Sequence, residues 1–274
     1  MQDILIVIPA RYSSSRFPGK PLAKIAGIEM IKRVADIARN ICDNNHDCNY
    51  VVATDDQRIV GFCQQHSIPV KTSCSSCQSG TERCWDIVAS LNEKPKFIIN
   101  LQGDNPLCPP HVIQALIDNW RTESADIFTP YIQLSWDEFA QFIENKQTTP
   151  FSGTSVLVDK KGFALAFSKN VLPAIRHLDE AKKQMEKSPV KRHIGLYGYT
   201  FSALRDYFTL SESLCEKSYI EGLEQMRFLE NGLKVKMVEV DYQGRKTTSG
   251  VDSPEDVLRV EQIIAEFGEL ILNR

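Results

Sequence analysis

The chain has 274 residues, of which 42% are hydrophobic and 24% are charged, proportions that are typical of a globular protein and exclude a disordered or fibrous one. This length is sufficient for one large α/β domain or for two small ones. Lysine and arginine number 32 against 35 aspartates and glutamates, a net charge of −3, which excludes the broad positive surface of a nucleic-acid-binding protein. Any anion-binding site is therefore local.

The first predicted element is a short apolar strand near the N-terminus. Residues 4–8 follow Asp3 and end at Pro9, so this run is too short for a signal peptide or a membrane-spanning helix. We therefore expect a cytoplasmic protein without membrane insertion.

Short β-branched runs alternate with amphipathic stretches through the first half of the chain. The runs predict strands over residues 3–9, 50–54, 97–101 and 127–132. The periodicity between them predicts helices over residues 30–41 and 112–120. This alternation favours an α/β fold with a doubly wound, mostly parallel sheet.

The alternation is less regular after Glu144. Strand-like runs at residues 156–158, 164–167 and 196–201 have no regular helix between them, so we expect the sheet to become mixed. Composition predicts a helix over residues 211–231, a strand over 234–240 and a last helix over 254–267. The dense charge of residues 176–192 predicts a lid or an exposed surface segment. Without a linker or repeat, we expect a single domain over residues 1–274.

The eight cysteines are spread over a chain that is long enough to fold without disulfides, so we expect reduced thiols. Cys74 and Cys77 have half of a zinc-site spacing, but no second close pair or nearby histidine completes four ligands. This absence disfavours zinc.

The loop after the first strand is rich in positive charge. Arg11, Arg16 and Lys20 occur without an acid between them, and Gly19 and residues 13–15, which are serines, permit close backbone approach. Because α/β sheets bind ligands at the carboxyl ends of their strands, these cations predict a polyphosphate site, such as one for a nucleoside triphosphate. The alternative is a solvated basic loop. The pattern is neither a Walker A loop nor a GxGxxG turn.

Two acids are candidate ligands for a hard cation. Asp104 follows Gly103 directly after a predicted strand, although a turn aspartate is the alternative interpretation. Asp252 precedes a helix that starts with the Ser253 cap and Pro254, and capping does not account for its carboxylate. Both acids therefore predict a metal site.

A third segment combines a helix cap with polar side chains. Ser79 and Glu82 form a capping box, which explains about half of the SGTER sequence at residues 79–83. Thr81 and Arg83 remain, and they suit recognition of a base or a phosphate at a helix N-terminus.

These segments occur in a fixed series with others. The motifs are PARYSSSRFPGKPL at residues 9–22, VATDD at 52–56, SGTER at 79–83, NLQGDNP at 100–106, RHIGLYGY at 192–199, LEQMR at 223–227 and GVDSPED at 250–256. In this order they resemble the 3-deoxy-manno-octulosonate cytidylyltransferases, or CMP-Kdo synthetases, over most of the chain. The resemblance implies a Rossmann-type fold like that of nucleotide-diphospho-sugar transferases, and a homodimer.

The resemblance also implies an Mg²⁺-dependent reaction in which an acidic 3-deoxy sugar such as Kdo attacks the α-phosphorus of CTP, giving the CMP-sugar for lipopolysaccharide or other surface glycan. It implies that the catalytic residues are Arg11, Arg16, Lys20 and Asp104, and that the metal ligands are Asp104 and Asp252. It places Ser79, Thr81, Arg83 and Gln102 at the nucleotide, and Lys169, His193, Tyr197, Glu221, Glu224 and Gln225 at the sugar. Without the resemblance, composition favours an exposed helix face for the last three, and packing near a strand is the alternative interpretation of His193 and Tyr197.

The sequence departs from the family pattern in several places. Ser76 and Cys77 replace Asp-His, and Asn105 replaces an acid after QGD. Ser155 stands at the lysine of a V-K-V pattern and Lys169 at the arginine of F-S-R, so one cation is lost and another loses its bidentate geometry. The acceptor is therefore expected to be Kdo or a close relative, such as an amino-substituted one. Two alternatives stay open: another sugar nucleotidyltransferase, and a non-catalytic CTP-binding paralogue.

Overall fold

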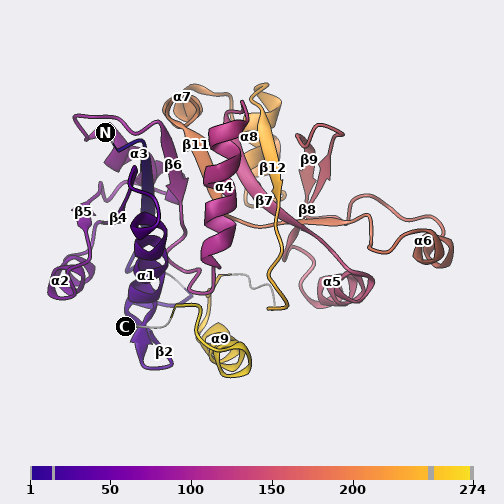
Figure 1. Cartoon of the computed structure of the whole chain (residues 1–274), viewed down its shortest axis with the longest axis horizontal. Helices are drawn as coiled ribbons and strands as arrows, with labels where there is room; N and C mark the ends of the chain where they lie inside the picture. Colours follow the sequence, from indigo (N-terminus) through magenta and orange to yellow (C-terminus); the bar gives the residue numbers. More distant parts are fainter. Residues whose placement is uncertain (1, 14–15, 246–249, 272–274) are drawn as a thin grey trace. The chain divides into compact units, whose positions relative to one another are not determined.

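The structure is a computed structural model that describes residues 2–13, 16–245 and 250–271 (Figure 1). By their contacts these residues form two compact units. The first unit comprises Met1–Ile117, Leu196–Leu204 and Tyr242–Arg274, and the second comprises Asp118–Gly195 and Arg205–Asp241. The chain passes between the units more than once. Whether they form one domain, as the sequence predicts, stays a prediction.

The first unit contains a mostly parallel sheet. Its strands in spatial order are β5 (Val70–Thr72), β4 (Cys48–Thr54), β1 (Ile4–Pro9), β6 (Phe97–Asn100) and β11 (Tyr197–Thr200). The first four are parallel, and β11 is antiparallel to β6. The strands predicted over residues 3–9, 50–54 and 97–101 are thereby confirmed. Because the parallel strands run in the same direction, the loops after β1 and β6 meet at one edge of the sheet.

The first unit also contains all or part of several helices. The elements are α1 (Met30–Asp43), α2 (Gln57–Gln65), α3 (Gly80–Ala89), α4 (Pro110–Thr122), α7 (Phe201–Asp206) and α9 (Pro254–Phe267), with the short η1 (Lys20–Leu22), β2 (Lys24–Ile25) and β3 (Ile28–Glu29). Both α1 and α3 pack against β1 and β4. The apolar stripe predicted for α1 is buried, and α9 has the predicted bounds.

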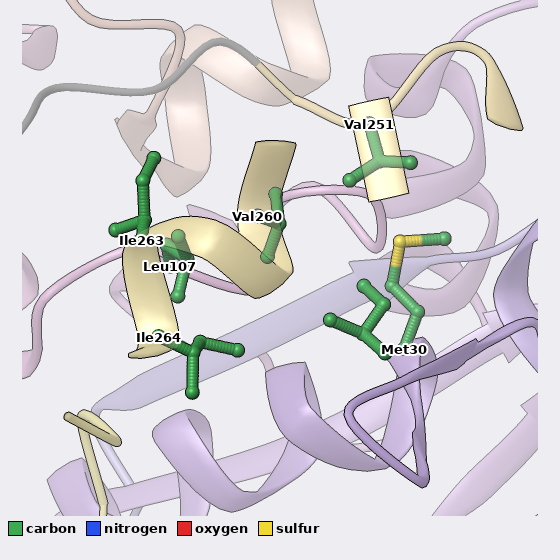
Figure 2. Close-up of a cluster of buried hydrophobic side chains, with 7 residues drawn as sticks. Met30, Leu107, Val251, Val260, Ile263 and Ile264 are labelled. Carbon is green, nitrogen blue, oxygen red and sulfur yellow. The ribbon is translucent and has the colours of Figure 1, made fainter. Parts of the chain in front are cut away.

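A buried apolar cluster joins α9 to the start of α1 (Figure 2). Its members are Ile25, Met30, Leu107, Val251, Val260, Ile263 and Ile264. Val251, whose side chain is fully buried, lies immediately before Asp252. Burial of this cluster therefore fixes the backbone from which the Asp252 carboxylate projects.

The second unit contains the mixed sheet that the sequence predicts. Its strands in spatial order are β12 (Val235–Glu239), β7 (Ile127–Gln133), β10 (Lys191–His193), β8 (Thr154–Val158) and β9 (Ala164–Ser168). Of the four pairs formed by these strands within the described residues, β12 with β7 is parallel and the other three are antiparallel. The accompanying helices are α5 (Trp136–Thr148), α6 (Leu178–Gln184), η2 (Tyr207–Thr209), η3 (Leu214–Glu216) and α8 (Gln225–Glu230).

The long helix predicted over residues 211–231 is wrong, because only η3 and α8 are helical there. The Ser213 hydroxyl accepts from the Cys215 amide and starts a tight turn. Gly222 then adopts a left-handed φ of 64°, and the Leu223 amide donates to the Cys215 carbonyl, so the chain folds back.

The charged segment at residues 176–192 forms α6 and the start of β10. No residue of α6 is buried, in agreement with an exposed surface segment, whereas a lid function stays a prediction. Within the part of the chain that the structure describes, no helix is both long and apolar enough to cross a membrane.

Candidate active site

A polar cavity of about 460 Å³ lies in the first unit, at the carboxyl ends of β1 and β6. Eight of the residues predicted for the triphosphate, the metal and the nucleotide line it: Arg11, Arg16, Lys20, Ser79, Arg83, Gln102, Asp104 and Asp252. A cavity of about 450 Å³ near the other ends of these strands is lined mostly by apolar groups and contains none of the predicted site residues. The polar cavity is therefore the candidate active site.

The two candidate metal ligands share a cation. The Lys20 ammonium lies 2.8 Å from Asp104 Oδ2 and 3.4 Å from Asp252 Oδ1, and Arg16 Nη2 lies 3.3 Å from the same Asp252 oxygen. Carboxylates that come this close to one ammonium can also share one divalent cation. Oxygen donors of this type are the ones that Mg²⁺ prefers, so the residues fit the metal.

Glycines permit this close approach of the two acids. A Cβ on Gly250 would lie 2.9 Å from Asp104 Oδ1, and one on Gly103 would lie 2.6 Å from the Pro9 carbonyl oxygen. The Val251 amide donates to the Asp104 carbonyl at 2.8 Å, which ties the segment before α9 to the end of β6. Any larger side chain at position 250 or 103 would push these segments apart.

At the start of α9, Asp256 caps the helix and Asp252 lines the cavity, as the sequence predicts. Asp256 accepts hydrogen bonds from the amides of Asp252 and Ser253, and it completes the capping box. The Asp252 carboxylate takes no part in the cap and contacts Arg16 and Lys20 instead.

Tyr12 and Gly19 close the basic loop. The Gly19 amide donates to the Tyr12 carbonyl, and a Cβ on Gly19, whose φ is 76°, would lie 3.0 Å from the Tyr12 hydroxyl oxygen. The guanidinium of Arg58 on α2 lies 3.3 Å from the centre of the Tyr12 ring. Sequence reasoning missed these roles of Tyr12 and Arg58. Ser14 and Ser15 lie outside the described residues.

The start of α3 forms another wall of the cavity. Ser79 accepts from the Glu82 amide, as predicted, but the Glu82 carboxylate accepts from the Gln78 amide, so only half of the predicted capping box forms. A Cβ on Gly80 would lie 2.9 Å from Gln102 Nε2, so the Gln102 side chain lies directly against the helix start. Thr81 is buried beside the Tyr199 hydroxyl, does not line the cavity, and its nucleotide contact stays a prediction.

Arg83 is the buried cation of the cavity, with only 1% of its side chain exposed. Its Nη1 contacts Asp55 Oδ1 at 3.2 Å and donates to the Ser73 hydroxyl. Its Nη2 is buried and has no hydrogen-bond acceptor among the residues that the structure describes. A buried donor without an acceptor costs about 1–3 kcal/mol, so this atom fits an acceptor on a ligand. Sequence reasoning missed Asp55 and Ser73, although Asp55 belongs to the VATDD motif.

Four of the residues predicted for the sugar lie in the second unit around β9 and β10. Glu221 accepts from the Lys169 amide and from the Ser168 hydroxyl, and the Lys169 ammonium donates to Thr154 Oγ1 at 3.0 Å. Gln225 is buried at the start of α8. His193 Nε2 lies 2.7 Å from Thr129 Oγ1, and burial, with the Lys169 charge, lowers the pKa of His193 to about 3.

The other two predicted sugar residues make different contacts. Glu224 lies beside Tyr207, where its negative charge and a hydrogen bond help burial to raise the pKa of that phenol. Tyr197 belongs to the first unit, and its ring stacks on that of Tyr199 with centroids 5.9 Å apart.

Three departures from the family pattern do not line the polar cavity. The Ser76 hydroxyl lies 2.9 Å from the exposed Cys74 sulfur, and Cys77 is buried. Asn105 is buried, and its amide donates to the Gln102 carbonyl. These substitutions therefore leave the lining of the cavity intact.

The fold and this cavity define an α/β protein whose polar cavity is lined by cations and carboxylates at the carboxyl ends of parallel strands. A profile of the family described as "Cytidylyltransferase" matches residues 5–237. The chain belongs to this family, and within it to the 3-deoxy-manno-octulosonate cytidylyltransferases.

Two relatives and one solved structure support this assignment. The 3-deoxy-manno-octulosonate cytidylyltransferase of Maricaulis maris is 44% identical over 98% of this chain and 100% of its own length. That of Syntrophotalea carbinolica is 38% identical over 94% and 97%. The structure of CMP:2-keto-3-deoxy-manno-octonic acid synthetase complexed with CTP matches with a TM-score of 0.81 and 30% identity over 96% of this chain and 98% of that one.

A 4-diphosphocytidyl-2C-methyl-D-erythritol synthase from Anaerococcus prevotii matches 96% of this chain and 98% of its own, with a TM-score of 0.58 at 10% identity, and shares the fold alone. The predicted α/β architecture, with its mixed, mostly parallel sheet, is confirmed.

The geometry of His193 predicts its titration. Because the folded protein lowers its pKa to about 3, the imidazole stays neutral from about pH 5 to pH 8, whereas an unfolded chain protonates near about pH 6.5. This group therefore lowers stability as the pH falls below about 6.5, and it has no effect above that value. NMR titration, with His193→Gln to assign the resonance, should show no His193 midpoint in this window. A midpoint near 6.5 would contradict the buried contact with Thr129.

Proposed function

We propose that this protein transfers a cytidylyl group from CTP to the anomeric hydroxyl of Kdo, or of a closely related 3-deoxy-2-ulosonic acid, and releases pyrophosphate. The supporting observation is the shared cation between Asp104 and Asp252, in a cavity that also presents Arg11 and Arg16. The names of the relatives, at up to 44% identity over nearly the full chain, support the nucleotide and the sugar.

In the proposed reaction the sugar hydroxyl oxygen forms a bond to the α-phosphorus of CTP, the bond from that phosphorus to the pyrophosphate oxygen breaks, and the hydroxyl proton is released to solvent. Arg11, Arg16 and Lys20 neutralise charge on the triphosphate and on the departing pyrophosphate. Asp104 and Asp252 would hold Mg²⁺, which supplies further neutralisation of phosphate charge. Positioning and charge carry this chemistry, so the site needs no covalent nucleophile.

In the proposal, the nucleotide binds to the residues that line the cavity at the start of α3. Arg83, held by Asp55 and Ser73, offers its Nη2 to an oxygen or nitrogen of the nucleotide. Ser79 and Gln102 line the cavity beside it. This arrangement fits a polar group of the cytosine base or the ribose.

The acceptor side of the proposal uses residues of the second unit. Lys169 supplies the positive charge for the carboxylate of the acid sugar, and neutral His193, Glu221, Glu224 and Gln225 supply hydrogen-bonding groups for its hydroxyls. This role of Lys169 explains why a cation is kept at the position of the family arginine.

We further propose that the CMP-sugar serves synthesis of lipopolysaccharide or another surface glycan, and that the enzyme is a cytoplasmic homodimer. Of the alternatives, a non-catalytic paralogue is disfavoured because Asp104, Asp252 and all three loop cations line one cavity. Another sugar nucleotidyltransferase would prefer a different nucleotide or a phosphorylated sugar.

The direct test is pyrophosphate release from CTP and Mg²⁺ in the presence of a panel of ulosonic acids, with UTP and sugar 1-phosphates as alternatives. We expect release with CTP and Kdo or a close relative, and its loss when EDTA removes the metal. Release only with UTP or a sugar phosphate would support the other nucleotidyltransferase class. Absence of release with every combination would refute the enzyme proposal.

Asp104→Asn should lower kcat on the order of a thousandfold, because one charged ligand of the proposed Mg²⁺ is lost. Asp3→Asn is the matched control, since Asp3 also pairs with a lysine, Lys96, at 2.9 Å but lies before β1 and away from the cavity. Its kcat should remain within about twofold of the original. Circular dichroism should show both variants folded, and equal kcat values for the two would eliminate the metal role.

Asp55→Asn should raise the KM for CTP about tenfold, because Arg83 loses the carboxylate that holds it. Asp36→Asn, which removes ion pairs with Lys32 and Arg39 on α1, should leave that KM unchanged. Steady-state kinetics at saturating sugar measures both values. An unaltered KM in Asp55→Asn would show that Arg83 does not depend on Asp55.

A further inference from the structure

The turn that carries Lys169 is held by hydrogen bonds from three separate residues of the second unit, namely Ser155, Glu221 and Lys146. Ser155, on β8, is fully buried, and its hydroxyl oxygen lies 2.5 Å from the Asn170 carbonyl oxygen and accepts from the Leu172 amide at 3.1 Å. Glu221 accepts from the Lys169 amide itself. The residue that replaces the family lysine at position 155 therefore binds the turn that carries Lys169.

Lys146 completes this arrangement from the last turns of α5. Its ammonium donates to the carbonyl of Lys169 at 2.6 Å and to that of Ser152 at 2.8 Å, and it lies 3.3 Å from the carbonyls of Pro150 and Gly153. An ammonium has three protons, so these carbonyl oxygens occupy all of them. Lys146 is therefore directed at the backbone, and none of its donors is left for a substrate.

The Lys146 ammonium contacts the Lys169 carbonyl although its surroundings disfavour a positive charge there. Burial and the positive charges of Lys169 and Arg192 lower the pKa of Lys146 to about 8, and only Glu221 acts in the opposite direction. Two ammonium groups that repel each other are nevertheless kept close by the Lys169 carbonyl. A lysine that served helix solubility alone would extend into solvent.

The side chain of Lys169 is thereby directed toward the acceptor residues. Its ammonium donates to Thr154 Oγ1, and its charge contributes to the lowered pKa of His193, so it lies near that ring. A lysine is a point charge on a flexible stem and lacks the rigid, bidentate geometry of arginine. Fixing the backbone at Lys169 reduces the freedom that must be lost when an anion binds.

We propose that Lys146 is a positioning residue for the acid sugar: by binding the Lys169 carbonyl, it holds the Lys169 ammonium where it receives the sugar carboxylate. Together with Ser155, it compensates for the lysine lost at position 155 and the arginine lost at position 169. This inference rests on the proposed role of Lys169 in acceptor binding. It makes Lys146 a determinant of affinity for the sugar and not for CTP.

A double-mutant cycle on the full-length protein tests this proposal. Lys146→Met should raise the KM for the acid sugar about tenfold and leave kcat and the KM for CTP within about twofold. In the Lys169→Met background, the same substitution should have no further effect, because a residue that acts through Lys169 has nothing left to position. Independent, additive effects on the sugar KM would make Lys146 a direct ligand and overturn the proposal.

Three further variants separate positioning from general stability. Lys146→Arg, which retains a charged donor, should stay within about threefold of the original sugar KM, and Lys146→Gln, a second variant in case the methionine variant does not fold, should be intermediate. Lys160→Met, at the exposed turn between β8 and β9, should have no effect. Thermal unfolding of each variant gives the fold control. A parallel rise in both KM values would mean a structural role and would overturn the proposal.

Measurements on the unsubstituted protein distinguish failure of the proposed function from failure of the positioning role of Lys146. If it turns over CTP with an ulosonic acid while Lys146→Met has an unchanged sugar KM, only the positioning role is refuted. If none of the acid sugars tested supports pyrophosphate release, the proposed function fails, and the positioning role fails with it.

Discussion

The site in the first unit depends on holding two carboxylates close together. Asp104 and Asp252 repel each other, and the Lys20 ammonium between them offsets that repulsion. The approach also needs backbone segments without bulk, since a Cβ on Gly250 would meet the Asp104 side chain. The buried Val251 then fixes the direction from which Asp252 arrives. The electrostatics of the cavity are thus a consequence of apolar packing around α9.

The part of the site that the sequence predicts is the part encoded by local rules. Arg11, Lys20 and Asp104 follow strands that are readable as short apolar runs, and parallel strands bring such loops to one edge. Asp252 was identified because the cap that follows it uses Ser253 and Asp256 and leaves its carboxylate unexplained. In each case a few neighbouring residues determine both the local structure and the direction of the functional group.

The parts that escaped prediction depend on contacts between distant segments. Asp55 pairs with Arg83 only because β4 and the start of α3 lie together, and Lys146 reaches the Lys169 carbonyl across a chain reversal. No spacing in the sequence reports either contact. The helix expected over residues 211–231 failed for a related reason: its composition favours a helix, but Gly222 in the left-handed region and the Leu223 amide bond to Cys215 reverse the chain.

Contacts between distant segments also change the interpretation of the departures from the family pattern at Ser155 and Lys169. Position by position, Ser155 and Lys169 are losses of a cation and of a bidentate donor, which would weaken recognition of a carboxylate. In the structure, Ser155 binds the turn next to Lys169, and Lys146 binds the turn from the other side. An arginine side chain has a rigid, bidentate geometry of its own. We infer that at Lys169 the orientation comes instead from hydrogen bonds of the surrounding backbone to Ser155, Glu221 and Lys146. A substitution that looks like a loss in the motif is therefore consistent with retained acceptor binding, because rigidity at one ammonium can replace a second hydrogen bond.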